Sequence, residues 1–456
     1  MTSLTETLAR FASDPPFSHA PDDAARIIRT GIIDTVATMI AGRNERVVQI
    51  VRQYVEARRP GVAESSVLMS GQRLPAQDAA LINGTAAHAL DYDDVALQGH
   101  PSTVLVPALM ADGEAMEAAG ADLVRAYLVG YEVWAELIGR DADSHHLKGW
   151  HPTAVFGTVA AAAALCCLRR LSAETSRNAI ALSASMAGGL VANFGTMTKP
   201  FHAGRAASAA IEAVRLAMRG MTAAPDAIEH HAGFLAGLSP KGNVKLDLPA
   251  HDLGRTLRIL ESGLSIKKYP MCYATHRVID AIIDLARKED IRLDDTGSVQ
   301  ATIGAAQASM LRNHAPMTAL EAKFSLEFAA ASALVARAVG LAQLTDGFVT
   351  SEEVRQAMSK VAISTVQTKC PIEPVFAFSD RVRIQLRNGR TLDSGEIRFA
   401  RGNAKLPLRE GELKAKFLDC VAGYAEIGAS ALYNRLAGLE NASNLRELAR
   451  SEATPA

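Results

Sequence analysis

Apolar residues recur every three or four positions from the N-terminus to about Gly263, a spacing that predicts helices with one face turned towards a core. The segment 22–41 shows this pattern clearly, because it carries Ile28, Ile32 and Val36 at helical spacing behind an acidic start. Further helices are predicted over 76–90, 103–119, 123–138, 153–171, 173–186, 203–219 and 227–232. The N-terminal part of the chain is therefore expected to be helical.

After Ser265 the pattern changes to one that includes strands. Val299 and Ile303 belong to an alternating stretch, and strands are predicted over 298–307, 361–366, 381–386 and 391–399. Asn388-Gly389 separates the last two segments and is a strong signal for a tight hairpin. Helices are predicted between the strands and after them, over 275–287, 322–339, 351–360, 410–437 and 441–451.

The order of these elements predicts a fold that is mainly α with an α+β insertion. We expect a large, discontinuous all-helical domain from residues 1–263 and 402–456, and a smaller α+β domain from residues 264–401. A junction between two domains is a common place for a ligand cleft, so binding residues are expected in segments near residue 264.

Composition narrows the class of protein. The formal net charge of −1 argues against a nucleic-acid partner or an anionic membrane, which would need a basic surface. The five cysteines have no framework spacing and no C-x-x-C, which predicts a reducing, cytoplasmic setting without a cysteine-bound metal. No signal peptide is expected at the N-terminus, and the apolar run 154–168 is interpreted as a buried helix rather than a membrane span.

The first segment that could carry chemistry is Asp91-Tyr92-Asp93-Asp94, followed by a Gly-His-Pro-Ser stretch that ends at Ser102. A calcium loop is excluded, because its sixth and twelfth positions would be Ala96 and Ser102 rather than Gly and Glu. An acidic capping loop and a functional site both remain open. His100 stands just before the helix predicted over 103–119, and the backbone N–H groups at the start of a helix favour an anion.

Two basic segments could bind an anion. Lys199, His202 and Arg205 lie close together without a nearby acid, and the segment 265–272 again collects cations at the expected domain junction. Exposed basic turns are the alternative for both. His151 stands at a predicted helix start, where it could cap the helix or donate to a bound anion, whereas His145 and His146 are expected to face solvent.

Taken in order, these segments resemble the 2-methylcitrate dehydratase family, also called the MmgE/PrpD family. The matching stretches are HALDYDD (88–94), GHPS (99–102), GWHPTAVFG (149–157), TKPFHAGRAA (198–207), SIKKYPMC (265–272), LEAKFSLEF (320–328) and ARGNAKLPL (400–408). Nucleotide-binding, zinc-hydrolase and serine-hydrolase signatures do not occur.

The resemblance implies a large helical domain and a smaller α+β lid domain, usually in a homodimer, with the active site in the cleft between them. It also implies action on a small polycarboxylate without a metal or other cofactor. The residues that it places in the cleft are Asp91, His100, His151, Lys199 and Lys267. Val95 stands where dehydratases and decarboxylases of the family usually have Thr, and Cys272 stands in a loop that often carries His or Cys.

Removal of a proton beside an ionised carboxylate needs cations for the growing negative charge and a base for the proton. Lys199 and Lys267 are expected to supply the charge, and His100 with Asp91 the proton transfer, with His151 binding or donating to the departing group. The expected substrate-binding set is Arg205, Lys268, Tyr269, Cys272 and Ser102.

Such a step could end in loss of water, inversion or loss of carbon dioxide. A hydro-lyase is our first expectation, with an epimerase or a decarboxylase as alternatives. A carboxylate-binding protein without catalytic activity is a more distant alternative.

Overall fold

The computed structural model of the 456-residue chain describes residues 3–58, 61–373 and 375–448. The chain divides into two compact units, one formed by Met1–Ser265 with Glu410–Ala456 and the other by Ile266–Arg409. We call them the helical unit and the α+β unit. The divisions fall after Ser265 and Arg409, where the sequence led us to expect residues 263 and 401. The predicted fold class, mainly α with an α+β insertion, is confirmed.

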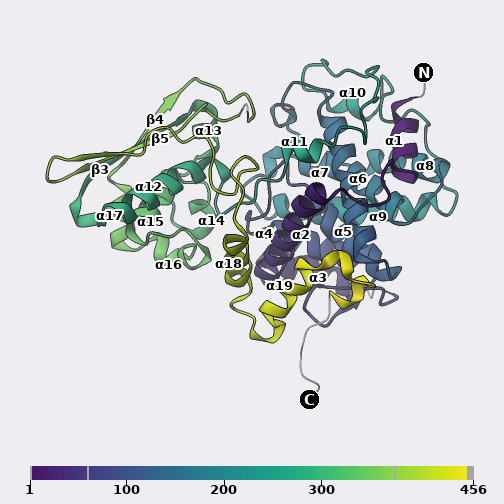
Figure 1. Ribbon diagram of the computed structural model, residues 1–456, viewed down its shortest axis with the longest axis horizontal. Helices are drawn as coiled ribbons and strands as arrows, with labels where there is room; N and C mark the ends of the chain where they lie inside the picture. Colours follow the sequence, from purple (N-terminus) through teal and green to yellow (C-terminus); the bar gives the residue numbers. More distant parts are fainter. Residues whose placement is uncertain (1–2, 59–60, 374, 449–456) are drawn as a thin grey trace. The chain divides into compact units, whose positions relative to one another are not determined.

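The helical unit is built from helices of both ends of the chain (Figure 1). Its helices are α1 (Leu4–Ser13), α2 (Asp22–Gly42), α3 (Arg46–Ala57), α4 (Ala76–Ala89), α5 (Ser102–Ala115), α6 (Gly120–Ile138), α7 (Pro152–Leu168), α8 (Ala173–Met186), α9 (Thr198–Ala217), α10 (Phe234–Leu238), α11 (Arg258–Ser262), α18 (Glu410–Val421) and α19 (Ala429–Ala437). Its 3₁₀ turns are η1 (His145–Lys148), η2 (Val191–Asn193), η6 (Ala425–Ile427), η7 (Leu439–Asn441) and η8 (Leu445–Glu447). The unit is not purely helical, because β1 (Ser65–Ser66) and β2 (Arg73–Leu74) form a short antiparallel pair.

Two glycines allow α4 and α9 to cross at very short range. A Cβ atom at Gly84 would lie 2.8 Å from the Cα of Gly204, and one at Gly204 would overlap the backbone oxygen of Leu81. Close approach of this kind is possible only without side chains at the crossing point. The contact holds the first turn of α9 beside the C-terminal end of α4, the two places from which the candidate site is built.

The α+β unit contains a four-stranded sheet in the order β4-β3-β5-β6. The strands are β3 (Thr296–Gly304), β4 (Val361–Val366), β5 (Arg381–Leu386) and β6 (Thr391–Asp393). The helices and turns are η3 (Tyr273–Thr275), α12 (His276–Lys288), η4 (Leu293–Asp295), α13 (Ala305–Met310), α14 (Ala319–Ala322), α15 (Leu326–Val335), η5 (Leu341–Gln343), α16 (Asp346–Val349) and α17 (Glu352–Met358). β4 is parallel to β3, and the other neighbouring strands pair antiparallel.

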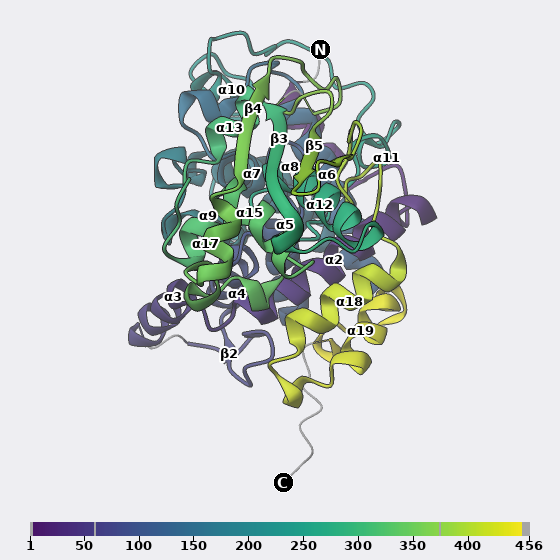
Figure 2. The same ribbon diagram turned by 90° about the vertical axis from the view of Figure 1, so that its left-hand side faces the viewer.

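Side chains alternate across this sheet as a half-buried strand requires. Val382, Ile384 and Leu386 of β5 are buried, whereas the residues between them face outward. Helices α12 and α15 cover the buried face and complete the core of the unit (Figures 1 and 2). The predicted hairpin is confirmed, with Gly389 at a φ of +89° between β5 and β6.

Several predicted boundaries are wrong for identifiable reasons. The helix expected over 203–219 begins at Thr198, because Pro200 falls in its first turn, where a missing N–H does no harm. The helix expected over 227–232 is absent from this described segment, which forms turns before α10. The helix expected over 410–437 ends at Val421 and is followed by a 3₁₀ turn, and α19 begins only after Gly428, whose φ is +63°.

Some helices were not predicted, and one predicted helix is replaced by 3₁₀ turns. α1 and α3 were not predicted, and only 3₁₀ turns occur in the described part of 441–451, with residues 449–451 outside the described residues. Among the described residues, no helix is both long enough and apolar enough to cross a membrane, as expected for the run that became α7.

Candidate active site

The candidate site lies in the helical unit around the loop from the end of α4 to the start of α5. Asp91, Leu97 and Gln98 in this loop have positive φ angles of 52°, 49° and 59°, which is unusual for residues other than glycine. Neighbouring backbone holds the loop in place, since Val95 and Ser265 exchange hydrogen bonds of 2.8 and 3.0 Å. Such local strain persists where surrounding structure fixes it, often at functional sites.

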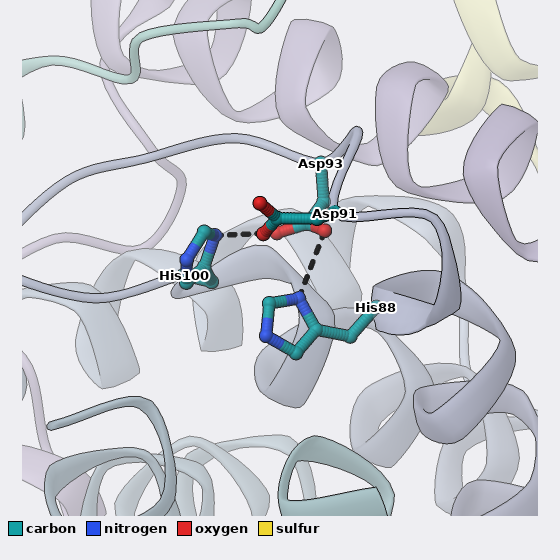
Figure 3. A group of neighbouring side chains, drawn as sticks. All are labelled: His88, Asp91, Asp93 and His100. Carbon is teal, nitrogen blue, oxygen red and sulfur yellow. Dashed lines mark hydrogen bonds and ion pairs between the residues drawn. The ribbon is translucent and has the colours of Figure 1, made fainter. Parts of the chain in front are cut away.

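Asp93 is the centre of this loop and lies between two imidazoles (Figure 3). Its Oδ1 is 2.9 Å from Nδ1 of His88, and its Oδ2 is 2.6 Å from Nδ1 of His100. The side chains of His88 and Asp93 are fully buried, whereas that of His100 is 13% exposed. Burial raises the pKa of Asp93, but the two imidazoles outweigh it and hold that pKa well below its usual value.

These contacts determine which nitrogen of His100 carries a proton. Nδ1 also lies 2.8 Å from the carbonyl oxygen of Asp94, so it faces two acceptors and must be the N–H. Nε2 of the neutral ring then has a lone pair and can accept a proton. The same ring arrangement is required of a general base.

Lys199 brings a positive charge to the same loop. Its Nζ is 2.6 Å from Oδ1 of Asp91, and both residues are buried. Lys199 lies in the first turn of α9, with the ring of Phe194 5.3 Å from its Nζ. An ammonium group has three donors, so the contact with Asp91 leaves it able to bind a further carboxylate.

A second group of imidazoles borders the first. The rings of His88 and His151 are stacked with centroids 5.9 Å apart, and Nδ1 of His151 is 3.2 Å from Nδ1 of His202. Burial, followed by neighbouring positive groups such as Lys199, lowers the pKa of both His151 and His202. Burial also lowers the pKa of His88 to about 4, so these rings are neutral at neutral pH.

His145 and His146 differ from the expectation that they face solvent. His145 is buried against Phe156, with ring centroids 4.8 Å apart, and His146 is partly buried. Burial, with His100 and Lys199 contributing, lowers the pKa of His146 to about 4. His146 therefore belongs to the electrostatic surroundings of the site.

Asp94 has the opposite surroundings to Asp93, although it is the next residue. Its Oδ2 accepts from the hydroxyl of Ser102, and that hydroxyl is 2.7 Å from the phenol oxygen of Tyr127. Burial raises the pKa of Asp94 to about 8, with a further contribution from the negative charge of Asp34. Ser102 is fully buried in this network, which differs from the expected contact with substrate.

A lysine of the C-terminal segment stabilises the conformation of the loop. Nζ of Lys416, in α18, is 2.5 Å from Oδ1 of Asp34 in α2 and donates to the backbone oxygen of Tyr92 at 2.7 Å. The same ammonium lies 3.9 Å from the centre of the Tyr92 ring. All three residues are buried, so a helix from the far end of the chain helps to set the loop conformation.

The donor atoms of His88, Asp91, Asp93 and His100 all lie within 4.8 Å of one another, a separation at which four such groups can hold a metal ion. In the present arrangement the same atoms bind each other, since Asp93 faces two N–H groups and Asp91 faces Lys199. A metal would have to displace these protons and the ammonium group. The arrangement as it stands fits a proton-sharing network better than a ligand set.

Of the residues expected in the α+β unit, Lys267 is buried, and its position depends on Gly402. Ile266 donates its backbone N–H to the oxygen of Gly402 at 2.7 Å. Gly402 has a φ of +90°, and a Cβ atom there would overlap the backbone oxygen of Ile266. In the chain, Lys267 follows Ser265, the residue paired with Val95, by two positions.

The other expected binding residues of this unit have structural contacts. Tyr269 donates its hydroxyl to Asp280 at 2.7 Å. Burial raises the pKa of Asp280, and the positive charge of Lys268 opposes this rise. Cys272 is buried in the core of the α+β unit. For Tyr269 and Cys272 these surroundings differ from the expected contact with substrate.

Arg205, expected to help bind the substrate, faces another direction from Lys199. Its side chain is 45% exposed and lies 3.7 Å from Glu212. Six positions along a helix turn a side chain by roughly 120° from the direction of Lys199. The structure therefore brings Asp91, His100, His151 and Lys199 together and leaves Arg205 outside this group.

Sequence reasoning missed His88, Asp93 and His202 as members of the group. Two of them had a signal, since His88 is a histidine in an alanine-rich helix and His202 follows Lys199 by one helical turn. That second signal could be used only if α9 had been predicted to start before Ala203.

Comparison with known proteins agrees with this architecture. Family models for the MmgE/PrpD N-terminal domain and the MmgE/PrpD C-terminal domain match residues 6–247 and 269–431. The chain belongs to the MmgE/PrpD family, and the resemblance seen in its sequence motifs is confirmed.

Its relatives of known function include cis-aconitate decarboxylases. The Homo sapiens enzyme is 28% identical over 429 residues, covering 91% of this chain and 87% of the relative. The Mus musculus enzyme is 28% identical over 431 residues, covering 91% and 86%. The Aspergillus terreus enzyme is 26% identical over 308 residues, covering 63% and 61%.

Proposed function

We propose that the protein is a lyase that transfers a proton at the carbon next to a carboxylate of a small polycarboxylic acid. The observation that carries this proposal is the orientation of His100, whose Nδ1 faces Asp93 and Asp94 so that Nε2 is available to a substrate. Lys199, bound to the neighbouring Asp91, would hold the substrate carboxylate. Family membership and the decarboxylase relatives support a lyase of this kind.

The net charge of the residues around the loop indicates that a substrate-binding site needs one more cation. Asp91 and Asp93 contribute two negative charges, Lys199 contributes one positive charge, and the buried imidazoles of His88 and His151 are neutral. A polycarboxylate needs more positive charge than this group supplies. We propose that Lys267 provides it, as the resemblance to the family implies.

Two reactions fit this arrangement. In dehydration, Nε2 of His100 takes the proton from carbon and the electron pair forms the double bond. The β-hydroxyl leaves as water with the proton that the resulting imidazolium gives back. In decarboxylation, His100 starts as the imidazolium, with a proton taken from water at Nε2. The bond to the carboxylate breaks, carbon dioxide leaves, and the electron pair ends on a carbon that receives this proton. Dehydration remains our first proposal, and the decarboxylase relatives favour the second.

A panel of di- and tricarboxylic acids in deuterated water, followed by NMR, tests the proposal. We expect deuterium at carbon together with loss of water or of carbon dioxide from at least one acid. Inversion without loss of either would assign an epimerase instead. Binding of the acids without exchange or turnover of any of them would contradict the proposed activity.

The role of His100 is tested with His100→Asn, because the amide nitrogen of Asn can take the place of Nδ1 but leaves no base at Nε2. We expect turnover to fall on the order of 10²- to 10⁴-fold while the fold is retained. His314→Asn is the matched control, since His314 is 70% exposed and pairs with Glu327 at 2.8 Å in the α+β unit. Near-normal activity of His100→Asn would remove His100 from the mechanism.

A further inference from the structure

The strongest feature not assigned a role is the fully buried carboxylate of Asp93 with an imidazole on each oxygen. The two Nδ1 atoms lie 2.9 and 2.6 Å away, and they come from different places, the last turn of α4 and the end of the loop. A buried carboxylate is costly unless charged or N–H groups compensate it. Here Nδ1 of His88 donates to Oδ1, and Nδ1 of His100 lies within ion-pair distance of Oδ2, so the carboxylate is held between two imidazole rings.

We infer that Asp93 is the positioning residue that holds His100 with Nδ1 protonated and Nε2 directed to the substrate, and that His88 fixes Asp93 from the other side. The inference rests on the proposed function of His100 as the group that transfers the proton. Asp93 has no exposed surface, so it acts through His100 and does not touch the substrate.

The role of His88 follows from its own contacts. Its Nδ1 donates to Asp93, and among the described residues its buried Nε2 has no hydrogen-bond partner. A neutral ring that donates one N–H stabilises the ionised form of Asp93 without adding a charge to the site. An ionised Asp93 then stabilises the imidazolium that forms when His100 accepts a proton.

Asp93→Asn is the decisive variant, and Asp94→Asn is its matched control on the adjacent residue. An amide at position 93 offers one oxygen and one NH₂ group, so it cannot accept from both Nδ1 atoms and forces one ring into the other tautomer. We expect kcat to fall on the order of 10²- to 10⁴-fold with little change in KM. Asp94→Asn should cost less than about tenfold, because an amide can replace a neutral hydrogen-bonded carboxyl.

Imidazole ¹⁵N NMR gives a readout that does not depend on activity. The unmodified protein should show the Nδ1–H tautomer for both His88 and His100, assigned by comparison with His88→Asn and His100→Asn. Asp93→Asn should convert at least one of the two signals to the Nε2–H tautomer, and Asp94→Asn should convert neither. An Nε2–H tautomer for His100 in the unmodified protein would overturn the inference, whether or not Asp93→Asn folds.

Position 88 offers a test by conservative replacement. Asn places an amide N–H where Nδ1 of histidine lies, so His88→Asn should retain most of kcat, whereas His88→Ala should lose at least tenfold, because Asp93 then lacks one donor. Equal losses in both variants, or losses confined to KM, would contradict a positioning role. If no polycarboxylate is turned over by the unmodified protein, the proposed function fails, and the tautomer measurement still decides the arrangement of His88, Asp93 and His100.

Discussion

On two faces of one loop, neighbouring carboxyl groups have different partners and opposite protonation states. On the front face, formed by Asp91 and Asp93, the partners are Lys199 and two imidazole N–H groups. On the rear face, formed by Asp94, the partners are the hydroxyls of Ser102 and, through it, Tyr127. Asp93 is ionised and Asp94 has a pKa of about 8, although both are fully buried.

The difference shows that burial alone does not set the charge of these residues. Both carboxyls lose water, which favours their neutral forms, and only donors or positive charges can restore the ionised form. Asp93 has an imidazole nitrogen within 3 Å of each oxygen, whereas Asp94 has a second carboxylate, Asp34, nearby. Asp91 and Asp93 on the front face are therefore charged, whereas Asp94 on the rear face is neutral and stabilises the loop.

The largest expected effect is the loss of stability on replacement of Lys416. Lys416→Met leaves Asp34 buried without its ammonium partner and removes the donor to Tyr92. Breaking a buried ion pair from one side costs about 3–5 kcal/mol, so urea unfolding should show a loss of this size. The double variant Asp34→Asn with Lys416→Met should recover part of it. A loss below about 1 kcal/mol in Lys416→Met would mean that the rear face does not depend on this pair.

Removing the cation of the front face should act on turnover. Lys199→Met takes away the charge that would hold the substrate carboxylate and leaves Asp91 without this partner, so kcat/KM should fall on the order of 10²- to 10³-fold. Lys241→Met is the control, because Lys241 is 64% exposed and makes a comparable 2.8 Å contact with Asp143. Equal activity of the two variants would show that the front face is not the anion site.

The sequence predicted much of the framework on which these two faces stand. The helix predicted over 76–90 corresponds to α4, which ends at Ala89. It could be predicted because alanine-rich apolar sequence at helical spacing strongly favours a helix. The sequence also predicted Asp91, His100, His151 and Lys199 as members of one group, through the resemblance to a family. Periodicity alone could not bring residues so far apart in the chain into contact.

The roles of individual carboxylates in the loop could not be predicted. Three positive φ angles, at Asp91, Leu97 and Gln98, decide which side chains face the imidazoles, and no local sequence rule specifies such angles outside glycine. The tie from Lys416 to Tyr92 spans 324 positions, which no local pattern reveals. Asp93 and Asp94 therefore looked equivalent in sequence, although their partners make them different.

The last prediction tests this contrast through the dependence of stability on pH. Native Asp94 has a pKa of about 8 against an ordinary value of 3.8, so between these limits the native state binds a proton that the unfolded state has lost. The free energy of unfolding therefore falls as pH rises through this window, and Asp94→Asn, which has no such proton, should escape this loss. Urea unfolding between about pH 5 and pH 8 should show the variant gaining stability relative to the unmodified protein as pH rises. The opposite dependence from His88, whose pKa of about 4 favours folding at higher pH, is present in both proteins and cancels in the difference. Parallel stability curves would mean that Asp94 is ionised in the native state, and the two faces of the loop would then carry the same charge.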